Sequence, residues 1–371
     1  MSEALDLFLE LAALPTPPGE ERPAADLVLR FLRDLGLQPE EDDTAATVGS
    51  TAGNVYARLE PTAAGTPIFL CAHLDTVPLD GELRPVVEDG VVRNAGGTIL
   101  GADNKAAVAA MLQGVRRVLA EGLPHAGVEL LFTTKEEVGL LGAAAFDHAR
   151  LRARIGYVYD QGGPIGEIVL GSPWSRAFEV RFHGRAAHSG MFPEEGRSAI
   201  RAAARAIADL RLGQVDDDTT ANVGVIRGGS AGNVVPEWCT FLAEARSHDE
   251  AKLSDLVQEM LEVCSFAASE TECEVDMEVR KSYAGYRLRP DEPAVRLAAV
   301  ALERCGHEPR FTRSGGAADA NVFNERGRRC VNLANAMVDV HTPHERIAVA
   351  DLEAMVRVTT ALVEAARDEG P

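Results

Sequence analysis

The 371-residue sequence lacks several features that would point to a membrane or to export. No apolar run reaches the ~18 residues that indicate a membrane-spanning helix. The N-terminal stretch MSEALDLFLELAAL is acidic and amphipathic, with neither the basic segment nor the cleavage site of a signal peptide. We therefore expect a cytoplasmic protein that does not bind membranes.

Basic residues are scarce relative to acidic ones. The 37 Lys and Arg against 57 Asp and Glu give a formal net charge of −20. Nucleic acids bind mainly through Lys and Arg at their phosphates, so this charge argues against a nucleic-acid partner. The six cysteines include no CxxC pair, and we expect small buried side chains rather than disulfides or a thiolate zinc site.

The length indicates two or three domains, and 46% hydrophobic residues are ample for their cores. Over residues 1–174, continuous apolar runs such as GVELLFTT and IGYVYD alternate with helical periodicities. Buried strands that alternate with helices predict an α/β domain, in which a mainly parallel mixed sheet carries helices on both faces. The same pattern resumes over residues 288–371.

The pattern between these two stretches differs. Residues 175–287 contain an alternating strand, a helix near 197–211, two strands, a helix near 250–269 and a last strand. This β-α-β-β-α-β order is typical of a ferredoxin-like α+β unit. The sequence thus predicts a smaller domain inserted into the larger one.

Residues of metal-ligand types follow the predicted strands of the larger domain. His73 and Asp75 end the run TPIFLCAHLD, Asp160 ends IGYVYD, and Glu136 and Glu137 follow GVELLFTT. Singly, each has an ordinary explanation as a structural histidine, a turn residue or a solvated loop residue. Because sites in open α/β sheets form at the carboxyl ends of strands, their co-occurrence there indicates a functional site.

Two more residues complete a ligand set for two metal ions. Asp103 lies between a Gly-rich turn and a helix, and His341 lies in DVHTPHE. His73 and Asp160 would bind one ion, Glu137 and His341 the second, and Asp103 would bridge both, as in two-metal hydrolytic sites. Mixed nitrogen and oxygen ligands favour two Zn²⁺, with Co²⁺ or Mn²⁺ as alternatives.

Two carboxylates remain outside this ligand set. Asp75 is spaced to orient the imidazole of His73. Glu136 neighbours a ligand, and a free carboxylate beside a metal-activated water is suited to be a general base. We therefore predict that Glu136 takes a proton from the attacking water and delivers it to the leaving amine.

The motifs HLDTV, GTILGADNKAAVAAM, TTKEEVGLLGA, YVYD and HTPHE, in this order, resemble those of the co-catalytic zinc peptidases. That group includes peptidase T, glutamate carboxypeptidase, aminoacylase and succinyl-diaminopimelate desuccinylase, and the chain looks closest to its peptidase T-like (tripeptide aminopeptidase-like) branch. The resemblance covers nearly the whole chain and implies the same ligands, with His341 rather than His344 as the ligand of HTPHE. It also implies a cis peptide bond between Asp103 and Asn104.

The resemblance implies further site residues. His188, in the inserted domain, would reach the active site of a partner subunit and stabilise the developing oxyanion. Asn233 and Arg246 would bind the carbonyl or carboxylate of the substrate, and the backbone of Gly315 and Gly316 would donate hydrogen bonds to it. Each has a plainer interpretation as an exposed histidine, a surface ion pair or a turn. The inserted domain would be the lid and would form a homodimer.

The function implied is hydrolysis of an amide bond in short peptides. We predict an aminopeptidase for di- and tripeptides, because aminopeptidases and dipeptidases of the family tend to carry Asp at the position of Asp160. Arg246 could also anchor a C-terminal carboxylate and so limit peptide length. An N-acyl amino acid deacylase or a carboxypeptidase on the same site is an alternative, and so is a metal-dependent binding protein without turnover.

Overall fold

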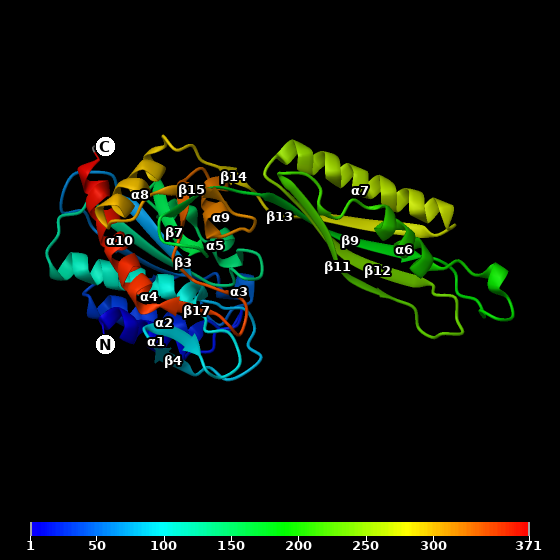
Figure 1. Cartoon of the computed structure of the whole chain (residues 1–371), viewed down its shortest axis with the longest axis horizontal. Coiled ribbons are helices and arrows are strands. Elements are labelled where there is room, and N and C mark those ends of the chain that lie inside the picture. Colours follow the sequence, from blue (N-terminus) through cyan, green and yellow to red (C-terminus); the bar gives the residue numbers. More distant parts are fainter. Residues whose placement is uncertain (1, 370–371) are drawn as a thin grey trace. The chain divides into compact units, whose positions relative to one another are not determined.

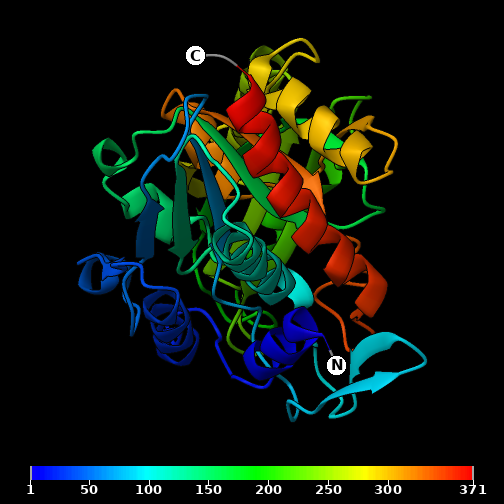
Figure 2. The same cartoon turned by 90° about the vertical axis from the view of Figure 1, so that its left-hand side faces the viewer.

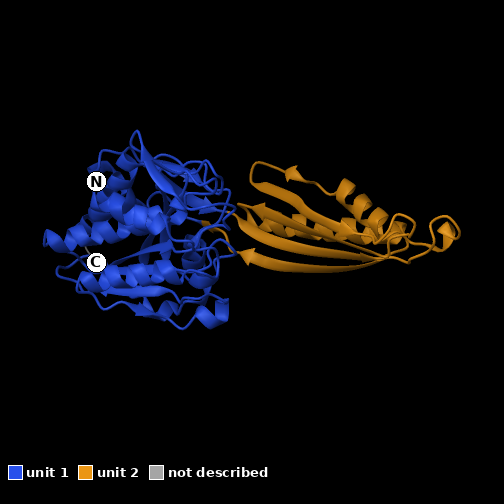
Figure 3. Ribbon diagram, turned by 90° about the horizontal axis from the view of Figure 1, so that it is seen from below, with its two compact units in different colours: residues 1–172, 287–371 blue, residues 173–286 orange. Residues whose placement is uncertain are grey.

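The computed structural model describes residues 2–369, and the chain divides into two compact units. Unit 1 comprises residues 1–172 and 287–371, and unit 2 comprises residues 173–286 (Figures 1 and 3). Unit 2 is therefore an insertion in unit 1, and the two stretches of unit 1 form one body.

A mixed sheet in the order β1-β2-β6-β3-β7-β16-β8-β14, with β15 paired to β8, forms the centre of unit 1. Its central strands β6, β3, β7 and β16 are parallel to one another, and β2 and β8 are antiparallel to their inner neighbours. This confirms the predicted α/β class. The strands are β1 (Glu40–Glu41), β2 (Val55–Leu59), β3 (Ile68–His73), β6 (Val128–Thr133), β7 (Ile155–Gln161), β8 (Glu167–Ser172), β14 (Tyr286–Arg287), β15 (Arg310–Arg313) and β16 (Arg329–Ala334).

Helices cover both faces of this sheet, and α10 (red) crosses the front of it in Figure 2. Helix α10 packs against α4 and α8, and α4 contacts β3 and β7. Helix α9 covers the other face, where its Phe323 lies 4.7 Å from the ring of Phe69 in β3. The helices are α1 (Glu3–Ala12), α2 (Arg22–Asp34), α3 (Ala45–Val48), α4 (Ala102–Ala120), α5 (Leu141–Ala145), α8 (Pro293–Arg304), α9 (Asp319–Glu325) and α10 (Val349–Asp368), with a 3-10 turn at His148–Arg150.

Unit 1 also contains a small three-stranded sheet. Its order is β17-β5-β4, formed by β4 (Pro85–Glu88), β5 (Val91–Asn94) and β17 (Arg346–Ala348). Strand β17 pairs antiparallel with β5 and follows directly on the HTPHE segment. The hairpin of β4 and β5 therefore fixes the end of that segment.

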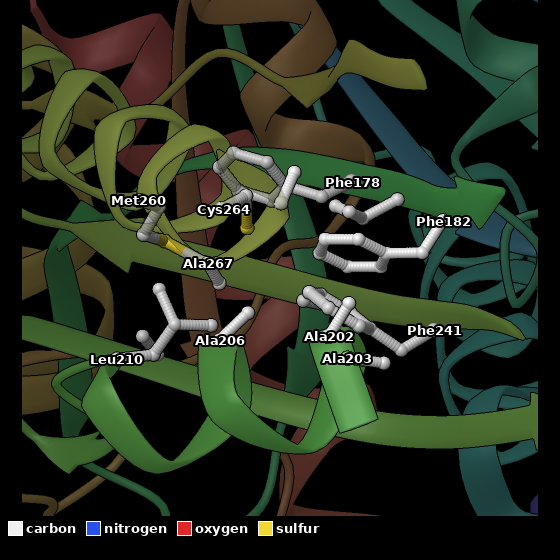
Figure 4. Close-up of a cluster of buried hydrophobic side chains, with 14 of the residues drawn as sticks. Phe178, Phe182, Ala202, Ala203, Ala206, Leu210, Phe241, Met260, Cys264 and Ala267 are labelled. Carbon is white, nitrogen blue, oxygen red and sulfur yellow. The ribbon is translucent and has the colours of Figure 1, made fainter. Parts of the chain in front are cut away.

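Unit 2 has the predicted ferredoxin-like topology. Its sheet has the order β10-β11-β12-β9-β13, and β9 lies antiparallel between β12 and β13. Phenylalanines of β9 and β12 face alanines of α6 and the Met260, Cys264 and Ala267 stripe of α7 (Figure 4). The elements are β9 (Trp174–His183), α6 (Ala199–Asp209), β10 (Gly213–Gln214), β11 (Thr219–Gly228), β12 (Trp238–Ser247), α7 (Glu250–Glu270) and β13 (Glu274–Tyr283), with a 3-10 turn at Pro193–Glu195.

Two expectations from composition can be set beside the structure. All six cysteines are free, and four of them are buried. Among residues 2–369, no helix is both long and apolar enough to cross a bilayer. The cytoplasmic location stays a prediction.

Candidate active site

The parallel strands of unit 1 bring the predicted site residues to one edge of the sheet. His73, the last residue of β3, pairs with Thr133, the last residue of β6. On the other side Cys71 pairs with Val158, which places His73 level with Asp160 in β7. Because the chain must leave each parallel strand here, the loops after β3 and β6 begin at the same edge.

Asp103 lies between two histidines that come from distant parts of the chain. Its Oδ1 is 3.2 Å from Nε2 of His73, and its Oδ2 is 3.1 Å from Nε2 of His341. A further carboxylate flanks each imidazole: Asp160 Oδ2 is 3.9 Å from His73 Nε2, and Glu137 Oε1 is 3.0 Å from His341 Nε2. One carboxylate thus joins two nitrogen–oxygen clusters.

The side chains of these clusters fit metal ions. Ligand atoms lie within 4.8 Å of one another in three groups, which are His73 with Asp103 and Asp160, His73 with Glu136 and Glu137, and Asp103 with Glu137 and His341. Imidazole nitrogens and carboxylate oxygens together are the donor set of zinc, cobalt and manganese sites. Divalent cations would also offset the mutual repulsion of the buried carboxylates.

The carboxylates of the site differ in how readily they ionise. Burial, and then the negative charge of Asp160, raise the pKa of Glu136 well above its ordinary value. Burial and Asp103 do the same to Asp160. Burial opposes ionisation of Asp103 as well, but hydrogen bonds from His341 and His73 hold its pKa well below the usual range. Of these three carboxylates, Asp103 therefore ionises most readily.

Both histidines are more basic than free imidazole. Burial works against protonation of His73, but its contacts with Asp103 and Asp75 raise its pKa well above the ordinary value. Hydrogen bonds to Asp103 and Glu137 raise the pKa of His341 to about 10. In the metal-free protein, protons therefore occupy the nitrogens that a metal would need.

Asp75 holds the loop that carries the two glutamates. Its Oδ1 accepts the backbone N–H of Glu136 at 3.0 Å, and its Oδ2 accepts that of Glu137 at 3.1 Å. The nearest atom of Asp75 to His73 Nδ1 is the backbone carbonyl oxygen at 3.0 Å, and its carboxylate Oδ1 is 3.5 Å away. Asp75 therefore orders the Glu136–Glu137 backbone as well as lying beside the imidazole.

The backbone around Asp103 is unusual. The peptide bond between Asp103 and Asn104 is cis, as the resemblance implied. His341 has a left-handed backbone conformation with φ of 62°, and its imidazole lies in the cluster. His344 is exposed, and its backbone N–H donates to the hydroxyl of Thr342.

Sequence reasoning missed four buried polar residues that surround this cluster. The carboxylate of Glu345 accepts three backbone N–H groups around the start of α4, and the side chain of Asn332 forms hydrogen bonds with the backbone of Asp160. Lys105 donates to the carbonyl of Leu14, and burial lowers its pKa to about 7. Asp319 accepts from the hydroxyl of Thr133, and burial raises its pKa to about 6. A polar residue inside an apolar run, such as the Asn of CVNLAN, was the signal available.

The predicted substrate residues of unit 2 lie on loops and on its sheet. His188 is exposed, and its Nδ1 accepts the backbone N–H groups of Gly190 and Met191 at 3.2 Å each. An accepting Nδ1 places the proton of a neutral imidazole on Nε2, which is then a donor. Asn233 is exposed, and Arg246 of β12 is half-buried with its Nη2 2.9 Å from Glu244.

The loop with Gly315 and Gly316 belongs to unit 1 and is held by side-chain hydrogen bonds. The hydroxyl of Ser172 donates to the carbonyl of Gly316 at 2.7 Å and accepts from Nδ2 of Asn321 at 2.8 Å. The backbone N–H of Gly316 donates to the side chain of Ser314. This glycine loop is thus anchored to the end of β8, the last strand before the chain enters unit 2.

Comparison with known proteins identifies the family. The sequence model described as peptidase family M20/M25/M40 matches residues 69–365, which is most of the chain. The chain belongs to this family.

Several known proteins are similar to this chain over nearly its whole length. The uncharacterized protein YqjE of Bacillus subtilis is 35% identical over 362 residues, 98% of either chain. The crystal structure of aminopeptidase PepT from Bacillus cereus superposes with a TM-score of 0.91 at 36% identity and 98% coverage of either chain. A tripeptidase structure from Staphylococcus aureus gives a TM-score of 0.95 at 32% identity, covering 99% of this chain and 98% of that one.

These similarities confirm the peptidase T-like branch of family M20/M25/M40 and the prediction of a peptide-hydrolysing enzyme. The roles of the single residues, the metal and the assembly go beyond what family membership establishes.

Proposed function

We propose that the chain is a two-metal aminopeptidase that releases the N-terminal residue of di- and tripeptides. The observation that carries this proposal is the position of Asp103, whose two oxygens lie 3.2 Å and 3.1 Å from the Nε2 atoms of His73 and His341. A carboxylate shared in this way suits the bridging ligand of a two-metal hydrolytic site.

The metal ligands would be His73 and Asp160 on one side, Glu137 and His341 on the other, and Asp103 between them. Two Zn²⁺ ions suit this donor set best, and Co²⁺ or Mn²⁺ could replace them. Bound divalent ions would make a water molecule acidic enough to attack at neutral pH and would polarise the scissile carbonyl.

Glu136 is proposed as the general base. It is buried beside the cluster, and Asp75 holds its backbone N–H, so the side chain has a fixed origin. A buried carboxylate with a raised pKa retains a proton more readily than a free one, which suits a group that takes a proton from water and then delivers it to the leaving amine. Asp75 would position this base and the neighbouring ligand Glu137.

Substrate binding is assigned to residues of both units. The proton on Nε2 of His188 would stabilise the oxyanion, in the active site of the partner subunit of a homodimer. Arg246 would bind the C-terminal carboxylate of a short peptide, and Asn233 would bind its carbonyl. The backbone N–H groups of Gly315 and Gly316 would donate to the same substrate, which for Gly316 would replace the bond to the side chain of Ser314. Sedimentation velocity tests the dimer, and a monomer at assay concentration would contradict it.

The peptide Ala-Gly-Leu distinguishes the candidate functions, because its two ends differ. An aminopeptidase releases alanine, and a carboxypeptidase releases leucine. Blocking the amino end as N-acetyl-Ala-Gly-Leu should abolish cleavage, whereas an N-acyl amino acid deacylase should release acetate from N-acetyl-leucine. Amidation of the C-terminus should raise KM if Arg246 binds the carboxylate.

The same assay tests the requirement for metal. A chelator should abolish release of alanine, and Zn²⁺ or Co²⁺ should restore it. Turnover that survives chelation would exclude the two-metal mechanism. If none of these substrates is cleaved with metal present, a binding protein without turnover is favoured.

A further inference from the structure

The turn before α4 has backbone N–H groups that its own residues do not satisfy. The N-cap of α4 is Gly101, which has no side chain to accept a hydrogen bond and adopts the left-handed conformation with φ of 75°. Asp103 is not helical either, with φ of −80° and ψ of 106°. The N–H groups at the start of this helix therefore need an acceptor from elsewhere.

Glu345 is that acceptor. Its Oε2 accepts the N–H groups of Leu100 at 2.8 Å and Gly101 at 2.7 Å, and its Oε1 accepts that of Asp103 at 2.9 Å. The Glu345 side chain is buried, with 1% of the residue exposed, and lies more than 240 positions along the chain from the turn it binds. Backbone N–H groups that converge in this way form a concave anion site, which a carboxylate fills.

The position of Glu345 in the chain links two proposed metal ligands. Glu345 lies four residues after His341 in the chain. Strand β17 begins at the next residue, Arg346, and its pairing with β5 holds the chain in place directly after Glu345. The same carboxylate thus fixes the backbone N–H of Asp103 and the segment that carries His341. Nε2 of His341 and Oδ2 of Asp103 are 3.1 Å apart.

We propose that Glu345 is a positioning residue for the metal centre: its carboxylate fixes the backbone of Asp103 so that the two side-chain oxygens face two different histidines. This inference rests on the bridging role of Asp103 under the proposed function. A carboxylate is required, because all three partners are donors and the side chain must offer two accepting oxygens. An amide has one oxygen, and its NH₂ group would face an N–H.

Glu345→Gln tests this role, with Glu129→Gln as a matched control. Glu129 is also buried and accepts backbone N–H groups, those of Arg152 at 3.1 Å and Ala153 at 2.7 Å. It lies at the start of β6, at the end of the sheet away from the site. Both variants lose hydrogen bonds to a buried carboxylate, and only Glu345→Gln alters the turn of Asp103.

The readout is metal binding by chelator-stripped protein, titrated with Co²⁺ and followed by its visible absorption. Wild type and Glu129→Gln should bind two equivalents with the same affinities. Glu345→Gln should bind at least one equivalent about 10- to 100-fold more weakly, the usual loss when a residue that orients a ligand is changed. Near-UV circular dichroism reports whether each variant is folded.

Each outcome decides between the possibilities. If Glu345→Gln binds both equivalents as tightly as the control, Glu345 is only structural and the inference is wrong. If the wild type itself binds fewer than two equivalents of Co²⁺, the result contradicts the proposed two-metal function rather than the role of Glu345. If Glu345→Gln does not fold, Glu345→Asp replaces it, because that variant keeps the negative charge but withdraws it from the N–H groups. A loss of affinity relative to the control again supports the role, and equal affinity overturns it.

Discussion

The side chain of Asn332 forms two hydrogen bonds with the backbone of Asp160. Its Oδ1 accepts the N–H of Asp160 at 2.8 Å, and its Nδ2 donates to the carbonyl at 2.8 Å. The pairing of β16 with β7 shifts register between Asn332 and Ala334. As a result, Asp160 of β7 has no paired residue in β16. An amide side chain therefore replaces the missing ladder bonds at the residue that is proposed to bind metal.

We expect Asn332→Ala to weaken metal binding at the side of His73 and Asp160 by about 10- to 100-fold. Loss of the amide leaves the N–H and carbonyl of Asp160 without partners, and the carboxylate can then move away from the imidazole. Isothermal titration of the chelator-stripped variant with Zn²⁺ measures the affinity of each equivalent.

Asn324→Ala is the control for this change. Asn324 bonds the backbone of Cys330 in the same manner, with Nδ2 2.7 Å from the carbonyl and Oδ1 3.3 Å from the N–H, near the opposite end of β16. Both variants should lose a similar free energy of unfolding, about 1–3 kcal/mol, because each leaves buried polar groups unsatisfied. Equal zinc affinities in the two variants would show that Asn332 only stabilises the sheet.

Three of the proposed ligands, His73, Glu137 and Asp160, could be located from the sequence because they follow recognisable apolar runs. A run such as IGYVYD identifies a buried parallel strand by itself, and the residue at its carboxyl end is then placed at the edge where sites form. The resemblance added what spacing could not, such as the choice of His341 over His344. Strand identity and the order of motifs are local properties, and both are readable from one sequence.

The residues that hold the proposed ligands could not be predicted, because their partners are backbone groups far along the chain. Asn332 and Asp160 are 172 positions apart, and Glu345 and Asp103 are 242 positions apart. Neither contact depends on the side chain of the partner, so the partner's residue type gives no signal. Asp75 illustrates the limit: its spacing from His73 predicted a contact with the ring, but not the bonds to the backbone of Glu136 and Glu137.

Glu136→Gln should lower kcat by about 10²- to 10⁴-fold while two metal equivalents remain bound. The amide has the size of the carboxylate but cannot accept the proton of the attacking water. Metal analysis and steady-state kinetics on the same preparation measure both quantities. Glu137→Gln is the matched control and should lose an equivalent of metal. If Glu136→Gln lost metal while Glu137→Gln kept it, the roles of base and ligand would be reversed.

Asp75→Asn should lower kcat by about 10- to 100-fold even when it is assayed with saturating metal. An amide offers one oxygen, so only one of the N–H groups of Glu136 and Glu137 keeps its acceptor, and the base loses its fixed position. Asp249→Asn is the control for loss of the charge alone, because one oxygen of Asp249 accepts both backbone N–H groups at the start of α7 and the oxygen of an Asn can do the same. A kcat as high in Asp75→Asn as in Asp249→Asn would show that the backbone of Glu136 needs no such support.

Metal binding should release protons and strengthen as the pH rises toward 10. His341 has a pKa of about 10 in the metal-free protein, because it is hydrogen-bonded to Asp103 and Glu137. At pH 8 it is therefore protonated, and a metal ion must displace that proton, which costs less as the pH approaches the pKa. Above pH 10 this contribution to the pH dependence should disappear.

Calorimetric titration of the stripped protein with Zn²⁺ at pH 8, in two buffers of different ionisation enthalpy, counts the protons released. His344→Gln should release as many as the wild type, because His344 is exposed, whereas His341→Gln should release about one fewer. The binding heat would be the same in both buffers if no proton had to leave. In that case the imidazole of His341 would be neutral before the metal arrives, and its contacts with the two carboxylates would be those of a neutral donor.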